Sequence, residues 1–151
     1  MDHANRAREL FLSGYNCAQS VLCAFSDVTG LDENTARRLA SSFGGGMGRM
    51  RETCGTCSAM FLIAGLCFGD YPPADREKKA QHYKLIQDLA ARFKAHNGTI
   101  CCRELLATLK PSATPIPEER TPEYYKIRPC VRFVEDAAHI LDEMLKERTV
   151  Q

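Results

Sequence analysis

The chain has 151 residues, of which 44% are hydrophobic and 26% are charged, an ordinary composition for one globular domain. Its formal net charge of +1 gives no electrostatic reason to expect nucleic acid or an anionic membrane surface as a partner. Aromatic residues make up only 8% and tryptophan is absent, so a base-stacking platform is not expected either. We therefore predict a single helical domain over residues 1–151 with no nucleic-acid partner.

The N-terminal segment gives no sign of export. It reads MDHANRAREL, which is charged throughout and lacks the apolar core of a secretory signal. The longest apolar run, Cys57 to Phe68, is shorter than the roughly 20 residues that span a bilayer. These features predict a cytoplasmic protein without membrane insertion.

Turn residues and polar N-caps divide the first part of the chain into helices. The first is expected over Ala4–Leu12, where Ser13-Gly14 ends it. Asn16 is a favoured N-cap for a second helix, from Cys17 to about Val28. Asp32 would cap a third helix that runs to about Phe43.

The next two helices are predicted to differ in character. Thr53 would cap a helix over Cys54–Phe68, which is apolar on nearly every side and so should be the buried centre of the fold. A long amphipathic helix is expected over Ala74–His96, with Asn97-Gly98 as its C-terminal stop. Its predicted inner stripe consists of Tyr83, Ile86, Leu89, Ala90 and Phe93.

Towards the C-terminus, Thr99 would cap a short helix through Leu109. Residues 110–122 contain four prolines and are predicted to form an irregular surface loop. A last helix should run from about Pro129 to about Lys146, with a core stripe of Phe133, Val134, Ala137, Ile140, Leu141 and Met144. Because no alternating strand pattern is present, the predicted fold class is all-α, a single-domain bundle of about six or seven helices around an apolar central helix.

Eight cysteines are many for a cytoplasmic chain. In a reducing compartment such a set indicates metal binding or redox chemistry rather than structural disulfides. The cysteines are Cys17, Cys23, Cys54, Cys57, Cys67, Cys101, Cys102 and Cys130.

Four of these cysteines, Cys17, Cys54, Cys102 and Cys130, fall in the first turn of a predicted helix. The first turn exposes unpaired backbone N–H groups and the positive end of the helix dipole, which stabilise a thiolate and lower its pKa from about 8.5. The thiolate is both the nucleophile and the metal ligand of cysteine chemistry. If the four helix starts converge, they form a thiolate-rich pocket for redox chemistry or for a zinc ion or an iron-sulfur cluster.

Cys54 is predicted to be the most reactive thiol, because a flexible loop and the cationic side chains Arg49 and Arg51 precede it. Two further arginines, Arg103 and Arg128, lie near other helix starts and would add positive field if they point inward.

The remaining thiols have other expected roles. Cys23 and Cys67 lie within apolar helices, where packing is the expected role. Cys57 and Cys101 are secondary candidates, and the spacing Cys54-x-x-Cys57 permits a disulfide across one helical turn. No strand precedes this pair, unlike the thioredoxin motif, and no second Cys-x-x-Cys completes a zinc ribbon.

The run GGGMG before Cys54 lets the backbone take positive φ values and approach a partner closely. Amides at Gly45, Gly46 and Gly48, followed by Arg49 and Arg51, could bind an anion or a cofactor phosphate. The run lacks the Lys-Ser/Thr of a P-loop and follows a helix rather than a strand. The alternative is a tight helix connection packed against the cysteine pocket.

Four segments together resemble the C-GCAxxG-C-C family of redox-active proteins, which are small, helical and prokaryotic. They are GYNCAQSV (14–21), GGGMGRMRETCG (44–55), CCRELL (101–106) and PCVRFVEDAAHIL (129–141), and they occur in the family's order. The resemblance implies that the four family cysteines are Cys17, Cys54, Cys102 and Cys130. The resemblance places the family's Cys-Gly-Ala-x-x-Gly motif on residues 54–59. Relative to this motif, Thr56 replaces the alanine and Ala59 replaces the second glycine, and Cys57 is an extra thiol at a variable position.

The resemblance implies thiol-disulfide or electron-transfer chemistry in the four-cysteine pocket, with an unknown redox partner or a small-molecule substrate. Two alternatives stay open: a zinc or iron-sulfur protein without turnover, and a helical interaction protein with incidental cysteines. The substrate, the electron donor and the oligomeric state are also open, with a homo-oligomer among the alternatives.

Overall fold

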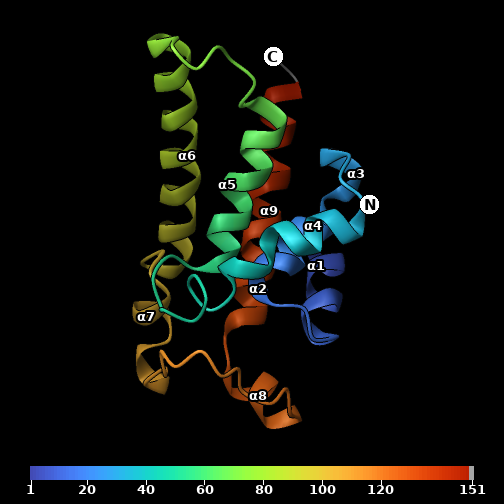
Figure 1. Ribbon diagram of the computed structural model, residues 1–151, viewed down its shortest axis with the longest axis vertical. Helices are drawn as coiled ribbons and strands as arrows, with labels where there is room; N and C mark the ends of the chain where they lie inside the picture. The colour runs from blue at the N-terminus through green and yellow to red at the C-terminus, as the bar shows by residue number, and fades with distance from the viewer. Residues whose placement is uncertain (150–151) are drawn as a thin grey trace.

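The computed structural model describes residues 1–149, in which nine α-helices and no strands are present (Figure 1). The all-α fold class is therefore confirmed. In chain order the helices are α1 (His3–Leu12), α2 (Cys17–Ala24), α3 (Ser26–Thr29), α4 (Glu33–Ala40), α5 (Gly55–Phe68), α6 (Arg76–Asn97), α7 (Cys102–Leu105), α8 (Pro122–Ile127) and α9 (Cys130–Thr149). Short 3₁₀ turns follow α4, over Ser41–Phe43, and α7, over Ala107–Leu109.

Three helices, α5, α6 and α9, pack against one another and run along the long axis of the molecule (Figure 1). Helix α2 packs against α1, α4, α5 and α9, so it connects the N-terminal helices α1 and α4 with the long helices α5 and α9. Helices α7 and α8 lie at the lower end of the view, where α5 and α9 begin (Figure 1). The cysteine-bearing helix starts are therefore at the same end of the bundle.

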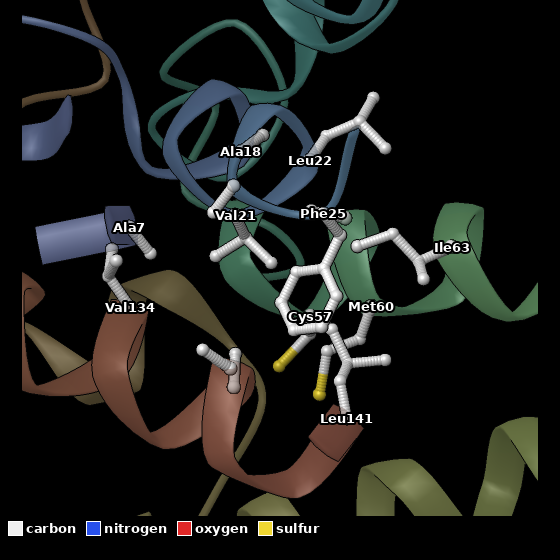
Figure 2. Close-up of a cluster of buried hydrophobic side chains, with 14 of the residues drawn as sticks. Ala7, Ala18, Val21, Leu22, Phe25, Cys57, Met60, Ile63, Val134 and Leu141 are labelled. Carbon is white, nitrogen blue, oxygen red and sulfur yellow. The ribbon is translucent and has the colours of Figure 1, made fainter. Parts of the chain in front are cut away.

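The core is built from the inner faces of α1, α2, α5 and α9. Figure 2 shows Ala7, Val21, Phe25, Met60 and Leu141 in one cluster, and none of these side chains has measurable exposure. The stripe predicted for the last helix is confirmed, because all six of its residues are buried in α9.

The stripe predicted for α6 is wrong at one position. Tyr83 is 56% exposed, and Leu85, which the prediction omitted, is buried. Buried residues of this helix follow the row Leu85, Leu89 and Phe93, at steps of four. At 3.6 residues per turn, Tyr83 lies about 200° from Leu85 and so faces away from the core.

Several helices differ from their predicted bounds, and the differences in the second and fourth predicted helices affect the core and the site. The second breaks at Phe25, whose ring is fully buried, and continues as the four-residue α3, which ends at the left-handed Gly30. Helix α5 begins one residue later than predicted, because Cys54 and not Thr53 is its N-cap. Its second half is also less buried than expected, since Leu66 is 45% exposed.

Helix α8 was not predicted at all. It begins after Thr121, whose hydroxyl accepts a hydrogen bond from the Tyr124 amide at 3.1 Å, and Pro122 occupies its first turn. The short helix expected after Thr99 is reduced to α7 and one 3₁₀ turn, and Cys101 is its N-cap. Within residues 1–149, no helix has the length and apolar character needed to cross a membrane.

The α6 correction can be tested by comparing two substitutions. Leu89→Ala removes a fully buried side chain, and we expect it to lower the free energy of unfolding by about 2–5 kcal/mol. Tyr83→Ala removes an exposed side chain and should change that free energy by about 0.5 kcal/mol or less. Urea denaturation measures both, and similar losses in the two variants would contradict the observed orientation of α6.

Candidate functional site

One cavity of about 70 Å³ is lined by four cysteines, Cys17, Cys54, Cys102 and Cys130. They are the N-cap of α5 and the first residues of α2, α7 and α9. Arg51, Arg120, Arg128 and Tyr124 also line the cavity. A space of this size holds a few water molecules or one small chemical group. The structure thus brings the four predicted cysteines around one cavity, while their role in a reaction stays a prediction.

The start of α2 is defined by a capping box. The Asn16 side chain accepts a hydrogen bond from the Gln19 amide at 2.8 Å, and the Gln19 side chain accepts one from the Asn16 amide at 3.0 Å. Two backbone donors that a helix start leaves unpaired are satisfied in this way. As a result, Cys17 is held at the first position of α2, next to the cavity.

A short antiparallel backbone pairing joins residues 51–54 to residues 100–103. The Cys54 amide donates to the Ile100 carbonyl at 2.7 Å, and the Cys102 amide donates to the Glu52 carbonyl at 2.6 Å. Between them, Thr53 and Cys101 form an isolated bridge. The pairing places the starts of α5 and α7, with their cysteines, side by side.

The glycine-rich run forms a left-handed turn in which all five residues from 45 to 49 have φ between 55° and 72°. Its amides bind backbone carbonyls: Gly48 donates to Ser42 at 2.8 Å and Arg49 donates to Gly44 at 3.2 Å. The Gly48 amide is therefore engaged within the chain, and the predicted anion binding by this run stays a prediction that depends on the arginine side chains.

The turn also packs directly against the thiols. The Gly45 amide partly offsets the effect of burial on the pKa of Cys17, and a Cβ at Gly46 would lie 2.7 Å from the Cβ of Cys102. A Cβ at Gly55 would lie 2.5 Å from the Cys17 sulfur. Because real Cβ atoms do not approach this closely, glycine at 46 and 55 allows three cysteine-bearing helix starts to meet.

Cys54 is the thiol whose pKa is lowered, to about 7. The main cause is a hydrogen bond from the Cys57 thiol, and burial acts in the opposite direction on the pKa. The Thr56 hydroxyl, 3.1 Å from the Cys54 sulfur, and the backbone N–H groups of Thr56 and Cys57 lower the pKa further. The Cys57 thiol and the Thr56 hydroxyl therefore both stabilise the Cys54 thiolate.

The other cavity thiols have raised pKa values. Burial raises the pKa of Cys17 and of Cys130 to about 12, and the negative charge of Cys54 adds to the increase. Burial also raises the pKa of Cys102, against the effect of Arg51, whose Nη1 lies 3.7 Å from the Cys102 sulfur. Cys54 is thus the cavity thiol that ionises near neutral pH, while burial favours the protonated form of Cys17, Cys102 and Cys130.

The four arginines predicted near the thiols do not all reach them. Arg51 and Arg128 line the cavity. Arg49 turns away and donates to the Thr114 carbonyl at 2.6 Å, and Arg103 is exposed and donates to the Met50 carbonyl at 3.1 Å. The low pKa of Cys54 therefore depends mainly on its hydrogen-bond donors rather than on Arg49.

Sequence reasoning missed Arg120 and Tyr124. The Arg120 guanidinium lies 4.5 Å above the ring of Phe11 and 5.0 Å from that of Tyr124, and it donates to the Phe11 and Tyr15 carbonyls, each at 3.1 Å. These contacts fix a cation at the edge of the cavity. The Thr121-Pro122 pair, a typical helix start, was the available signal for this region.

The secondary and packing cysteines lie outside the cavity lining. Cys57 is fully buried among core side chains (Figure 2), and the Cys101 thiol donates to the Arg51 carbonyl at 3.6 Å. Cys23 is buried, with its thiol 3.8 Å from the Glu33 carbonyl, and Cys67 is half-buried against the core. Across residues 1–149, no three His, Cys, Asp or Glu side chains are placed to hold one metal ion. The zinc and iron-sulfur hypotheses stay predictions.

The low pKa of Cys54 can be measured from the ultraviolet thiolate absorbance that Cys54→Ser loses. We expect this absorbance to appear as the pH rises through about 7. Thr56→Ala and Cys57→Ala should each move the midpoint upward, because each removes a donor to the thiolate. Cys67→Ala, which is remote from the cavity, should leave it unchanged. A Cys54 midpoint at or above the ordinary cysteine pKa would contradict this account of the site.

Comparison with known proteins supports the pattern of the four cysteines. Residues 15–144 match the family described as "Putative redox-active protein (C_GCAxxG_C_C)". Searches of curated proteins and of solved structures found no significant match. The matched residues make up most of the chain and include Cys17, Cys54, Cys102 and Cys130. The chain therefore belongs to the C-GCAxxG-C-C family.

Proposed function

We propose that the chain carries out thiol-disulfide exchange in the four-cysteine cavity, with Cys54 as the attacking thiolate. The observation that supports this most strongly is a single thiol of low pKa in a cavity whose other thiols stay protonated. Exchange proceeds by attack of a thiolate on a disulfide sulfur, and it is fastest when the pKa of the attacking thiol is near the ambient pH. The pKa of Cys54, about 7, meets that requirement.

In the first step, the Cys54 thiolate attacks one sulfur of a disulfide substrate. The substrate S–S bond breaks, one half leaves as a thiolate, and the other half is joined to Cys54 as a mixed disulfide. In the second step, Cys57 transfers its proton to the departing thiolate and attacks the Cys54 sulfur. The substrate is reduced by two electrons: the half released in the second step carries the proton of Cys57, the thiolate released in the first step takes its proton from water, and Cys54 and Cys57 are oxidised to a disulfide.

Cys57 is the proposed second thiol because it lies one helical turn from Cys54 and its thiol interacts with that of Cys54, lowering the pKa of Cys54. Its side chain is fully buried in the core (Figure 2), so a substrate in the cavity does not reach it. The interaction with Cys54 and, second, burial raise the pKa of Cys57, so it stays protonated until the Cys54 sulfur is consumed. An external thiol reductant would return the pair to the dithiol state.

The other family cysteines, Cys17, Cys102 and Cys130, would respond to oxidation of Cys54. The negative charge of the Cys54 thiolate is one cause of the raised pKa of each of these thiols. A disulfide at Cys54 carries no charge, so this contribution to each pKa disappears. We propose that oxidation of Cys54 makes its neighbours easier to ionise and draws them into further exchange.

The proposal can be tested with bis(2-hydroxyethyl) disulfide as substrate and a thiol reductant as electron donor. Cys54→Ser should reduce turnover to the uncatalysed rate, because the nucleophile is lost. With the thiol reductant left out, Cys57→Ser should stop at the mixed disulfide, which intact-protein mass spectrometry detects as one substrate half bound to Cys54. Cys67→Ser serves as the matched control and should keep the wild-type rate.

Full activity in Cys54→Ser would overturn the proposal. Metal analysis of anaerobically purified protein tests the alternative function, zinc or iron-sulfur binding without turnover. Stoichiometric zinc or iron that is lost in Cys54→Ser, together with no disulfide reduction by the wild type, would favour a metal-binding protein without turnover.

A further inference from the structure

A second, wider cavity of about 410 Å³ adjoins the thiol cavity. We call it the arginine chamber. The residues that line both cavities are Asn16, Gly45, Arg51, Arg120, Tyr124 and Arg128. Because six residues form a wall of both spaces, a ligand in the arginine chamber would lie next to the thiols.

The arginine chamber has a strong excess of positive charge. Arg49, Arg51, Arg120 and Arg128 line it, and Glu118 is the one carboxylate among its lining residues. The chain as a whole has a net charge of only +1, so the four guanidinium groups are a local concentration. Such a concentration attracts small anions and raises their local concentration.

The cations are held in place by the fold. Arg51 is 3% exposed and donates to the Ser112 carbonyl at 2.9 Å, and Arg128 is 9% exposed and lies 5.0 Å from the Tyr124 ring. Buried guanidinium groups are costly without anionic partners. Glu118 forms ion pairs with Arg128 and with Arg49, and its distance to Arg49 is 3.6 Å. The Glu118 side chain is 46% exposed. One half-exposed carboxylate leaves most of this charge without an acidic partner.

We propose that the arginine chamber binds the anionic group of a small thiol or disulfide, a carboxylate or a phosphate, and positions its sulfur at Cys54. Guanidinium groups suit this task because their planar donors match carboxylate and phosphate oxygens. The second half of the inference, positioning of the sulfur, rests on the proposed thiol-disulfide exchange. The first half, anion binding, does not.

Anion binding is tested with probes that cannot react. Isothermal titration of the Cys54→Ser protein uses 3,3′-thiodipropionate, a dicarboxylate with a thioether in place of a disulfide, and, separately, inorganic phosphate. Arg49→Gln and Arg128→Gln should each weaken binding about tenfold or more, as expected for the loss of a hydrogen bond between charged groups. Arg38→Gln makes the same charge change on the exposed face of α4, outside the chamber, and should bind as the parent does.

Positioning is tested by turnover with 3,3′-dithiodipropionate, which is anionic, and cystamine, which is cationic. The wild type should reduce 3,3′-dithiodipropionate faster than cystamine. In Arg49→Gln, the rate with 3,3′-dithiodipropionate divided by the rate with cystamine should fall towards one. Arg49 is less buried than Arg128, so Arg49→Gln is informative even if Arg128→Gln fails to fold.

The outcomes separate the two proposals. If either probe binds the Cys54→Ser protein and the arginine substitutions weaken that binding, anion binding in the arginine chamber is supported. If the wild type at the same time reduces no disulfide, the proposed exchange reaction is contradicted. Binding of phosphate alone identifies a phosphate group as the anion. If neither probe binds, or if Arg49→Gln and Arg128→Gln bind as tightly as Arg38→Gln, the inference is overturned.

Discussion

The backbone pairing of residues 51–54 with residues 100–103 is the constraint on which the site depends. It holds the start of α5 against the start of α7, directly after the left-handed turn that separates α4 from α5. That turn and the residue that follows it closely are costly, because Met47 and Arg49 within the turn and Arg51 after it each adopt a positive φ, at about 1–2 kcal/mol per residue. Backbone hydrogen bonds and close packing against Cys102 and Cys17 offset this cost. The cavity is therefore assembled by the backbone itself.

This arrangement places opposite charges in neighbouring spaces. Cys54 is surrounded by donors from its own helix start, so its negative charge is stabilised locally. The guanidinium groups of Arg51, Arg120 and Arg128 form the wall between the thiols and the wider chamber. A thiolate at Cys54, beside cations that Glu118 neutralises only in part, would suit a substrate that carries both a sulfur to be attacked and an anionic group to be bound.

Local sequence signals predicted much of the fold and of the site, because they act within one helix. Caps such as Asn16 and Asp32 and the stripe of α9 depend on neighbours in the sequence, as does the placement of Cys17 and Cys54 at helix starts. The errors came from tertiary contacts. The direction in which Arg49 points and the exposure of Tyr83 depend on segments far away in the chain. The effect of Thr56 and Cys57 on the pKa of Cys54 was not predicted either, since Thr56 was noted only as a replacement for alanine and Cys57 only as an extra thiol that could form a disulfide with Cys54.

The central claim is that Cys17, Cys54, Cys102 and Cys130 surround one space, with Cys57 directly behind Cys54. A trivalent arsenical, which bridges two thiols only when they are close together, tests this in the fully reduced protein. Peptide mapping after reaction with one equivalent identifies the bridged pair. The account predicts that every bridge joins two of these five cysteines and that Cys54→Ser lowers the yield. A bridge that involves Cys23 or Cys67, or no bridge at all, would contradict it.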